Sequence, residues 1–137
     1  MRFDTKAAVV VREDLADWQK LNVTAFLSSG IAHATDDVMG SEPYADASGN
    51  QYLRLLREPV LVFAADGAAL ARTHARALSR GLAVAVYTED MFATGNDADN
   101  RAAVRSVEAG KLNLVGLGLY GPRTPVDKVL KGLTLHG

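Results

Sequence analysis

The chain has 137 residues, no cysteine and a formal net charge of −1 at pH 7, and this length predicts a single domain over residues 1–137. The lack of cysteine excludes a disulfide framework, a thiolate zinc site and a thiol nucleophile. The balanced charge argues against a nucleic-acid partner, because phosphate backbones select strongly basic surfaces.

Hydropathy points to a soluble protein. Hydrophobic residues make up 48% of the chain, but no apolar run approaches the roughly 20 residues that a membrane helix requires. Residues 1–6 lack the apolar core of a signal peptide. We therefore expect a cytoplasmic protein with no membrane partner.

Short apolar runs alternate with helical patterns from the N-terminus onward. Residues 7–11 predict a strand that is buried on both faces. A long helix is expected next, with Asp14 as its N-cap and apolar residues at helical spacing from Val23 to Ile31. The polar stretch from about Ala34 to Asn50 predicts a long surface loop.

The second half continues the alternation, and three further apolar runs predict strands at residues 60–64, 82–87 and 112–120. The helix between the first two is expected to be capped by Asp66 and ended by Gly81, and another helix follows the turn at residues 94–97. A last helix is expected with Thr124 as N-cap and Pro125 at N1. Residues 133–135 then add a short strand or pack against the body. Four strands alternating with helices predict a three-layer α/β sandwich.

Gly116, Gly118 and Gly121 spell G-x-G-x-x-G inside the last predicted strand. A dinucleotide fingerprint instead needs glycines that follow a strand and open a helix, with an acidic residue about 20 positions later. Here Pro122 follows the motif and the chain ends before such an acid, so we expect no dinucleotide and no other cofactor. Because Gly116 and Gly118 share one strand face, they predict close approach of a helix, a ligand or another backbone.

Candidate ligand-binding residues gather near the ends of the predicted strands: Lys20, Asn22, Tyr87, Thr88, Tyr120 and Arg123. In open α/β sheets, ligands bind beyond the carboxyl ends of the strands. The first four residues share one edge if the first and third predicted strands are parallel. Whether Tyr120 and Arg123 join them depends on the direction of the fourth strand, which the sequence leaves open. A structural role is the alternative for each residue.

The other polar patterns are weaker indications of a catalytic or binding site. The three histidines are not at metal-ligand spacing, so no metal site is expected, and Ser28-Ser29 lies within a predicted helix and not on a nucleophile elbow. Residues 96–100 resemble part of a calcium loop without its glycine and glutamate, and helix capping is their expected role. Arg72, Arg76 and Arg80 recur along one helical face, which predicts a solvated face or, alternatively, a phosphate-binding ridge.

Several short motifs resemble those of the type II peptidyl-tRNA hydrolases: Val10-Val11-Arg12 with Asp14-Leu15, Lys20, Gly81-Leu82, Gly121-Pro122, Val126-Asp127-Lys128-Val129, and Gly132-Leu133 with Leu135. A closer likeness spans nearly the whole chain and is to a family of uncharacterised bacterial proteins, a domain of unknown function that shares the hydrolase fold. It rests on Leu21-Asn22, Gly40, Asp46-Ala47-Ser48-Gly49, Glu58-Pro59-Val60, Ala65-Asp66 and the stretch from Leu117 to Arg123. The resemblance implies a mixed four-stranded sheet within a three-layer α/β/α sandwich, commonly as a homodimer.

The hydrolase activity is not expected to carry over. The resemblance implies that ester cleavage uses a glycine-flanked lysine, a glutamine and a histidine in the first helix, and an Asp-Ala-Gly-Xaa-Thr stretch after the third strand. This chain keeps Lys20 without the glycines, has Thr24 in the place of the glutamine, lacks a histidine at residues 26–29 and has residues 88–92 in place of the last motif. We therefore expect a protein of unknown function that binds a small ligand or partner in a cleft near Lys20, Asn22 and Thr24. The alternative is a divergent hydrolase of peptidyl-tRNA or another acyl ester.

Overall fold

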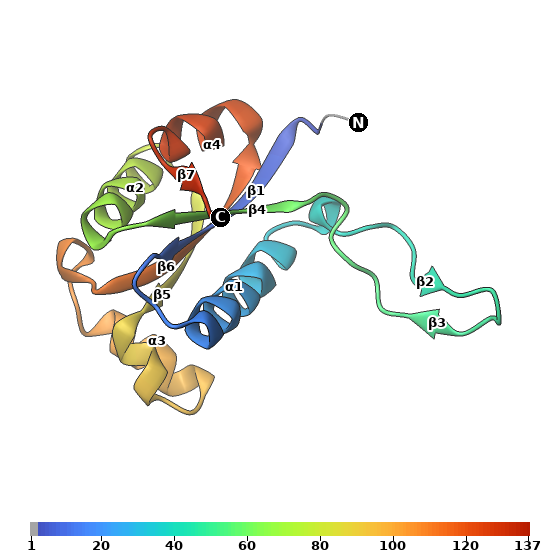
Figure 1. The fold of residues 1–137 in the computed structure, drawn as a ribbon, viewed down its shortest axis with the longest axis horizontal. Helices are drawn as coiled ribbons and strands as arrows, with labels where there is room; N and C mark the ends of the chain where they lie inside the picture. Colours follow the sequence, from blue (N-terminus) through green and yellow to red (C-terminus); the bar gives the residue numbers. More distant parts are fainter. Residues whose placement is uncertain (1–2) are drawn as a thin grey trace.

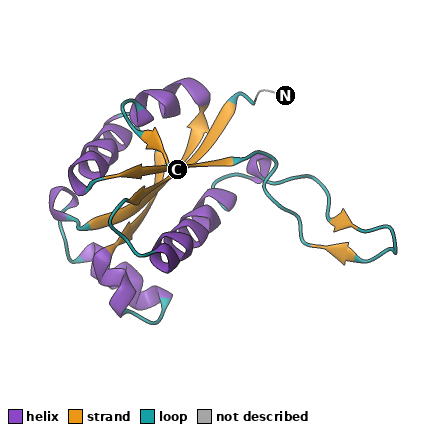
Figure 2. Cartoon of the chain, viewed as in Figure 1, coloured by secondary structure: helices purple, strands orange, loops and turns teal. Residues whose placement is uncertain are grey.

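A mixed sheet with helices on both faces forms the body of the molecule in the computed structural model, which describes residues 3–137 (Figures 1 and 2). The sheet has the order β5-β6-β1-β4-β7, and its strands are β1 (Thr5–Arg12), β4 (Val60–Ala65), β5 (Ala83–Thr88), β6 (Leu114–Pro122) and β7 (Thr134–Leu135). Strand β1 is parallel to β4 and antiparallel to β6, and β6 is antiparallel to β5. Strands β1 and β5 therefore run in the same direction, and their carboxyl ends lie at the edge of the sheet where β6 begins.

The helices divide between the two faces of the sheet: α1 (Asp17–Ala32) packs on one face, and α2 (Gly67–Ser79) and α4 (Arg123–Leu130) pack on the other. Helix α3 (Asp97–Arg105) follows β5 and the short 3₁₀ helix η2 (Glu89–Ala93), and Figure 1 shows it beside the β5 edge. Two more 3₁₀ helices, η1 (Asp36–Val38) and η3 (Ala109–Lys111), lie in loops.

Strand β1 is buried on both faces, as its continuous apolar run predicts. Ala8 and Val10 pack in the core beneath α2 and α4, whereas Ala7, Val9 and Val11 pack in the core beneath α1. Alternate side chains of a strand point to opposite faces, so an apolar residue is needed at every position of a central strand that is covered on both sides.

The two glycines of β6 allow α1 to approach the sheet closely, which confirms the prediction. A Cβ atom at Gly116 would lie 2.5 Å from Val23 Cγ1, and a Cβ atom at Gly118 would lie 3.2 Å from Leu27 Cβ. The motif is thus a packing device inside a strand. It does not open a helix, as a dinucleotide site requires.

The predicted four-stranded sheet is wrong, because the sheet has a fifth strand. Strand β7 pairs with β4 through Phe63 and Leu135 and through Ala64 and Thr134. It is two residues long, too short for a periodic signal, and only its tertiary pairing makes it a strand.

Two predicted helix starts are also wrong. Helix α1 begins at Asp17 with Ala16 at the N-cap, where the Gln19 side chain accepts a hydrogen bond from the Ala16 backbone at 3.0 Å. Asp14 pairs with Arg12 instead. Helix α4 begins at Arg123 directly after Pro122, so Thr124 lies inside it. The cap of α2 by Asp66 and its end at Gly81, which has φ +68°, are as predicted.

The predicted surface loop, from about Ala34 to Asn50, covers only part of a long projection, which we call the arm and define as residues 40–57. Its strands β2 (Tyr44–Ala45) and β3 (Gln51–Tyr52) pair with each other and stand away from the sheet and its helices (Figure 1). At the root of the arm, Met39 bridges to Leu56 and the Gly40 amide donates to Leu55 O at 2.8 Å. Composition alone predicted a loop because each strand is only two residues long.

Candidate functional site

The predicted site residues of α1 point to two different sides of that helix. Asn22 lies on the side toward β5 and α3, together with Tyr87 at the end of β5. Lys20 and Thr24 lie on the side toward β1, β4 and the C-terminus. The sequence placed these residues near one cleft, but the structure has two hollows separated by the helix.

The larger hollow has a volume of about 840 Å³ and lies between α1, β5, η2 and α3. Four aromatic side chains line it, and we call it the aromatic hollow: Trp18, Phe26, Tyr87 and Phe92. The ring of Tyr87 lies 5.6 Å from Phe26 and 5.2 Å from Phe92, and Trp18 meets Phe92 edge-on at 6.0 Å. These separations are those of favourable aromatic pairs, so the rings form one continuous wall.

The Tyr87 hydroxyl is a polar group within the aromatic wall. The ring is buried, and the Asn22 side-chain amide donates to its hydroxyl oxygen at 3.4 Å. Burial raises the pKa of Tyr87, because the phenolate is disfavoured away from water, and the hydrogen bond from Asn22 opposes this shift. The hydroxyl therefore stays protonated near neutral pH and can act as a donor.

The opposite wall of the aromatic hollow comes from the turn before α3 and from α3 itself. Asn100, Arg101 and Arg105 line this side. Thr94 donates to Asn100 Oδ1, and Arg101 pairs with Asp97 one turn earlier on the helix. An apolar wall thus faces a rim of amide and guanidinium groups with the Asp97 carboxylate among them, and an apolar pocket with a few polar groups is the usual composition of a small-molecule site.

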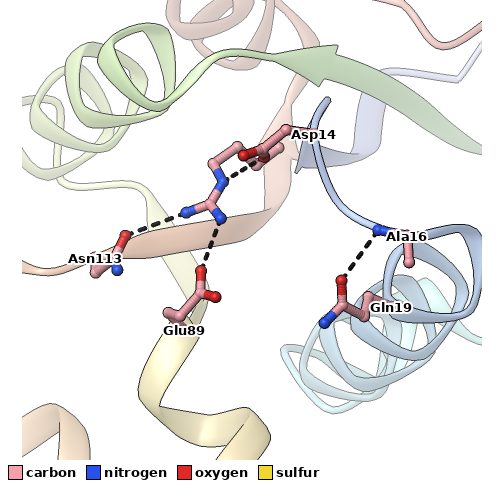
Figure 3. A network of polar contacts seen from close by, with 6 residues as sticks. Asp14, Ala16, Gln19, Glu89 and Asn113 are labelled. Atoms are coloured by element: carbon pink, nitrogen blue, oxygen red, sulfur yellow. Dashed lines mark hydrogen bonds and ion pairs between the residues drawn. The ribbon is translucent and has the colours of Figure 1, made fainter.

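Arg12 connects the loops at the carboxyl edge of the sheet, and Figure 3 shows its partners Asp14, Glu89 and Asn113. Its guanidinium donates to Asp14 at 2.6 Å, to Glu89 at 2.7 Å and to Asn113 at 3.2 Å. These residues come from the β1–α1 loop, from η2 and from the segment before β6. Hydrogen bonds to the two carboxylates raise the pKa of Arg12 against the opposing effect of burial. One side chain therefore holds three segments together, a role that was not predicted from the sequence.

The smaller hollow has a volume of about 360 Å³ and contains the two remaining α1 candidates. Lys20 Nζ lies 3.2 Å from His136 Nε2, and Thr24 lines the same wall. His136 arrives here because its backbone amide donates to Val62 O at 2.8 Å, next to the β4–β7 pair. Sequence reasoning missed His136, since it lies 116 positions from Lys20 and outside any motif.

Thr88 has a different environment from Tyr87. Its side chain is buried, and among residues 3–137 its hydroxyl oxygen has no hydrogen-bond partner. It does not line the aromatic hollow. A bulge between Tyr87 and Thr88 shifts the pairing with β6 at this point.

Tyr120 and Arg123 lie at the far end of the sheet, because β6 runs antiparallel to β1 and β5. Arg123 donates through Nε to Phe3 O at 2.9 Å and lines a small hollow of about 180 Å³. Glu58 lines the same hollow and accepts a hydrogen bond from the Thr5 hydroxyl at 2.8 Å. The structure therefore does not bring Tyr120 and Arg123 to the residues on α1 and β5.

The remaining polar patterns have structural roles. Asn96 caps α3 by accepting from the Asp99 backbone at 2.9 Å, as predicted. Arg72, Arg76 and Arg80 are exposed, and Arg76 donates to Lys131 O at 3.1 Å. Within the part of the chain that the structure describes, no group of three or more metal-binding side chains is found. Among residues 3–137, no helix combines the length and apolar character needed to cross a membrane.

A comparison with protein-family models identifies the family. The family described as "Protein of unknown function (DUF2000)" matches residues 5–137. The solved structure of a protein of unknown function from Agrobacterium tumefaciens strain C58 is 48% identical, covers 99% of this chain and 100% of its own, and has a TM-score of 0.95. No curated protein matches the chain. The predicted likeness to a bacterial family of unknown function is confirmed, and the chain belongs to the DUF2000 family.

Proposed function

We propose that the aromatic hollow binds a small organic ligand with a planar apolar body. The observation that carries this proposal is the wall of four aromatic rings, of which Trp18 and Phe26 are 62% and 50% exposed. Exposed aromatic surface in a concave site is unfavourable in water, and a flat ligand that stacks against it removes that surface from solvent. The hollow also lies at the carboxyl edge of parallel strands, where ligands of α/β proteins bind.

The polar rim supports a ligand that carries an acidic group. Arg101, which is paired with Asp97, and Arg105 both line the hollow. Guanidinium groups bind carboxylate or phosphate by paired hydrogen bonds, and Arg105 is the candidate for this contact. Asn22 and the Tyr87 hydroxyl offer neutral donors and acceptors on the other side. The ligand class is therefore an aromatic or heteroaromatic acid.

The only tryptophan of the chain makes a direct test possible, because Trp18 lines the hollow. Titration of a panel of aromatic acids should change the fluorescence of Trp18 and raise the thermal midpoint. Phe92→Ala should weaken binding at least tenfold, since it removes the ring between Trp18 and Tyr87. The control Leu78→Ala removes an apolar side chain from α2, which does not line the hollow, and should leave affinity unchanged. Equal affinity in both variants would contradict the proposal.

A second candidate function is hydrolysis of an acyl ester, which the Lys20–His136 contact favours. A neutral histidine can act as a general base toward water, and a nearby lysine can stabilise the developing oxyanion. Thr24 offers a hydroxyl in place of the expected glutamine. Purified protein should be assayed with peptidyl-tRNA and simple esters, with Lys20→Ala and His136→Ala as variants. We expect negligible turnover of peptidyl-tRNA, and turnover that both variants abolish would promote this candidate.

We further propose that residues 1–137 form one domain with the type II peptidyl-tRNA hydrolase fold, and that the protein is a cytoplasmic homodimer with no nucleic-acid partner. The mixed sheet with helices on both faces supports the fold. The balanced charge supports the absence of a nucleic-acid partner.

A further inference from the structure

A buried carboxylate without a countercharge lies at the end of the sheet where β1 and β4 begin. Glu58, which precedes β4 by two residues, is only 6% exposed. Glutamates are almost never buried to this extent unless a cation pairs with them, because removing a carboxylate from water is costly. Among residues 3–137, however, no lysine, arginine or histidine forms an ion pair with Glu58. Its charge is therefore uncompensated within the described chain.

Thr5 orients this carboxylate and leaves one of its oxygens free. The Thr5 hydroxyl donates to Glu58 Oε2 at 2.8 Å and accepts from Arg57 Nη2 at 3.3 Å. A hydroxyl has one proton to donate, so Thr5 cannot also serve Oε1, which is buried and has no hydrogen-bond partner among residues 3–137. A buried polar atom without a partner indicates a missing water or ion. A water supplies a hydrogen bond but no charge, so a cationic group satisfies Oε1 more completely.

The hollow that Glu58 lines, which we call the Glu58 hollow, accepts only a compact molecule. Its volume is about 180 Å³, below the roughly 300 Å³ of the smallest usual drug-sized pockets. The rest of its lining is partly apolar and comes from Phe3, Ala7, Pro59 and Leu61. The cation that fits here is therefore an ammonium group on a short apolar body.

A second charged group in the Glu58 hollow has the opposite sign. Of the two basic residues that line it, Lys6 is already paired with Asp127 at 2.5 Å. Arg123 donates through Nε to Phe3 O at 2.9 Å, but among residues 3–137 its two Nη nitrogens make no hydrogen bond. A guanidinium binds a carboxylate by paired N–H donors. The hollow thus offers one free acceptor and one free donor group of opposite charge.

We propose that the Glu58 hollow binds a compact zwitterion of the class of small aliphatic amino acids, with its ammonium group on Glu58 Oε1 and its carboxylate on Arg123. Such a ligand compensates both side chains at once and brings no net charge into the site. The Glu58 hollow lies at the opposite end of the sheet from the aromatic hollow and shares no lining residue with it. This inference therefore goes beyond the proposed function and does not depend on it.

Isothermal titration calorimetry of the full chain with three matched compounds tests the pair of contacts. L-alanine carries both charges, ethylamine lacks the carboxylate and propionate lacks the ammonium group. Alanine should bind, and each of the other two should bind about tenfold more weakly or not at all, because each leaves one charge of the hollow unpaired. Absence of alanine binding at millimolar concentration would overturn the proposal, and so would equal affinity for alanine and ethylamine.

Two variants assign the contacts to residues. Glu58→Gln keeps the size of the side chain but removes its charge, so it should weaken alanine binding about tenfold and change propionate binding little. Arg123→Gln should weaken alanine binding to a similar extent and leave ethylamine binding unchanged. This dependence on the compound separates a lost contact from a lost fold. The control Glu13→Gln, at an exposed position after β1, should bind alanine normally, whereas unchanged alanine affinity in Glu58→Gln would contradict the assignment.

Fluorescence of Trp18 keeps this test separate from that of the aromatic hollow. Trp18 lines the aromatic hollow and not the Glu58 hollow. Saturation with alanine should therefore raise the thermal midpoint without changing the Trp18 emission. An emission change that follows alanine saturation would place the compound in the aromatic hollow and overturn the site at Glu58.

Discussion

The two faces of the sheet are covered in different ways. On one face α2 and α4 lie side by side, and each buries an apolar side and exposes a charged one. Leu70 and Ala77 of α2 are fully buried, whereas Arg72, Arg76 and Arg80 are exposed. On the other face α1 packs alone, with a hollow on each flank and apolar side chains on its outer side.

The two faces therefore differ in the side chains that they expose: α2 exposes arginines, whereas the outer side of α1 exposes apolar side chains. The face under α2 and α4 has an ordinary apolar core and a solvated exterior. Away from the Glu58 hollow, its described side chains do not indicate a binding partner. The α1 face has exposed aromatic rings, a lysine–histidine contact and the fixed loops around Arg12. Binding functions are therefore expected on the α1 face, and substitutions there should have effects that matched substitutions on the other face lack.

The largest expected effect comes from the contact between β6 and α1. Gly118→Leu should lower the free energy of unfolding by about 3 kcal/mol, because the side chain would overlap Leu27 and Ala85 and force the helix away from the sheet. Urea unfolding measures this change. The control Gly67→Ala lies in the first turn of α2 with open space around it and should change stability by less than about 1 kcal/mol. A loss below about 0.5 kcal/mol for Gly118→Leu would show that the α1 contact is not tight.

A smaller loss is expected from the loop network at the edge of the sheet. Arg12→Gln should destabilise the protein by about 1–2 kcal/mol, since it removes hydrogen bonds to Asp14 and Glu89 from a side chain that is 18% exposed. Fluorescence of Trp18 should also shift, because Glu89 begins η2 and η2 carries Phe92. The matched change Arg72→Gln on the exposed side of α2 should cost less than about 0.5 kcal/mol. Equal losses in the two variants would remove the distinction between the faces.

The α2 face should show a pH dependence of its own through His74. Burial lowers the pKa of His74 below its ordinary 6.5, because the charged imidazolium is disfavoured in the core. The unfolded chain then takes up a proton as the pH falls below 6.5 and the folded chain does not, so stability present above that pH is lost on the way down. His74→Leu should flatten the stability profile between about pH 7 and 5. An unchanged slope in His74→Leu would contradict the assignment.

The sequence predicted most of the body, because its signals are local. Continuous apolar runs identified β1 and β4, and the Asp66 cap and Gly81 gave the limits of α2. The glycines of β6 correctly predicted close approach. Strand β7 was left open between a short strand and simple packing, since a two-residue strand has no period. The start of α1 was missed, because the Asp14 side chain pairs with Arg12 and does not cap the helix.

The candidate site was predicted less completely, because it depends on tertiary arrangement. Asn22 and Tyr87 lie together, as expected if the first and third predicted strands are parallel. Strands β1 and β5 do run in the same direction. Lys20 and Thr24 fell on the other flank of α1, and antiparallel β6 carried Tyr120 and Arg123 to the far end of the sheet. Phe92 and His136 belong to no motif, and Arg12 belongs to a motif that did not indicate its contacts with the three loops. Their roles come from contacts with residues distant in the sequence.

The smallest expected effect lies in the arm. It tests whether the hydrogen bonds to Asp46 hold the turn of the arm in solution. The Tyr52 hydroxyl and then Asn50 hydrogen-bond the Asp46 carboxylate and lower its pKa from 3.8 to about 2. A lowered carboxyl pKa means that the stabilising contribution is present above the ordinary value and is lost as the pH falls through the folded value. The amide resonances of Ser48 and Asn50 should therefore titrate with a midpoint near 2. Tyr52→Phe removes the largest cause and should move that midpoint upward, toward 3.8. A wild-type midpoint already near 3.8 would mean that these hydrogen bonds to Asp46 do not persist in solution.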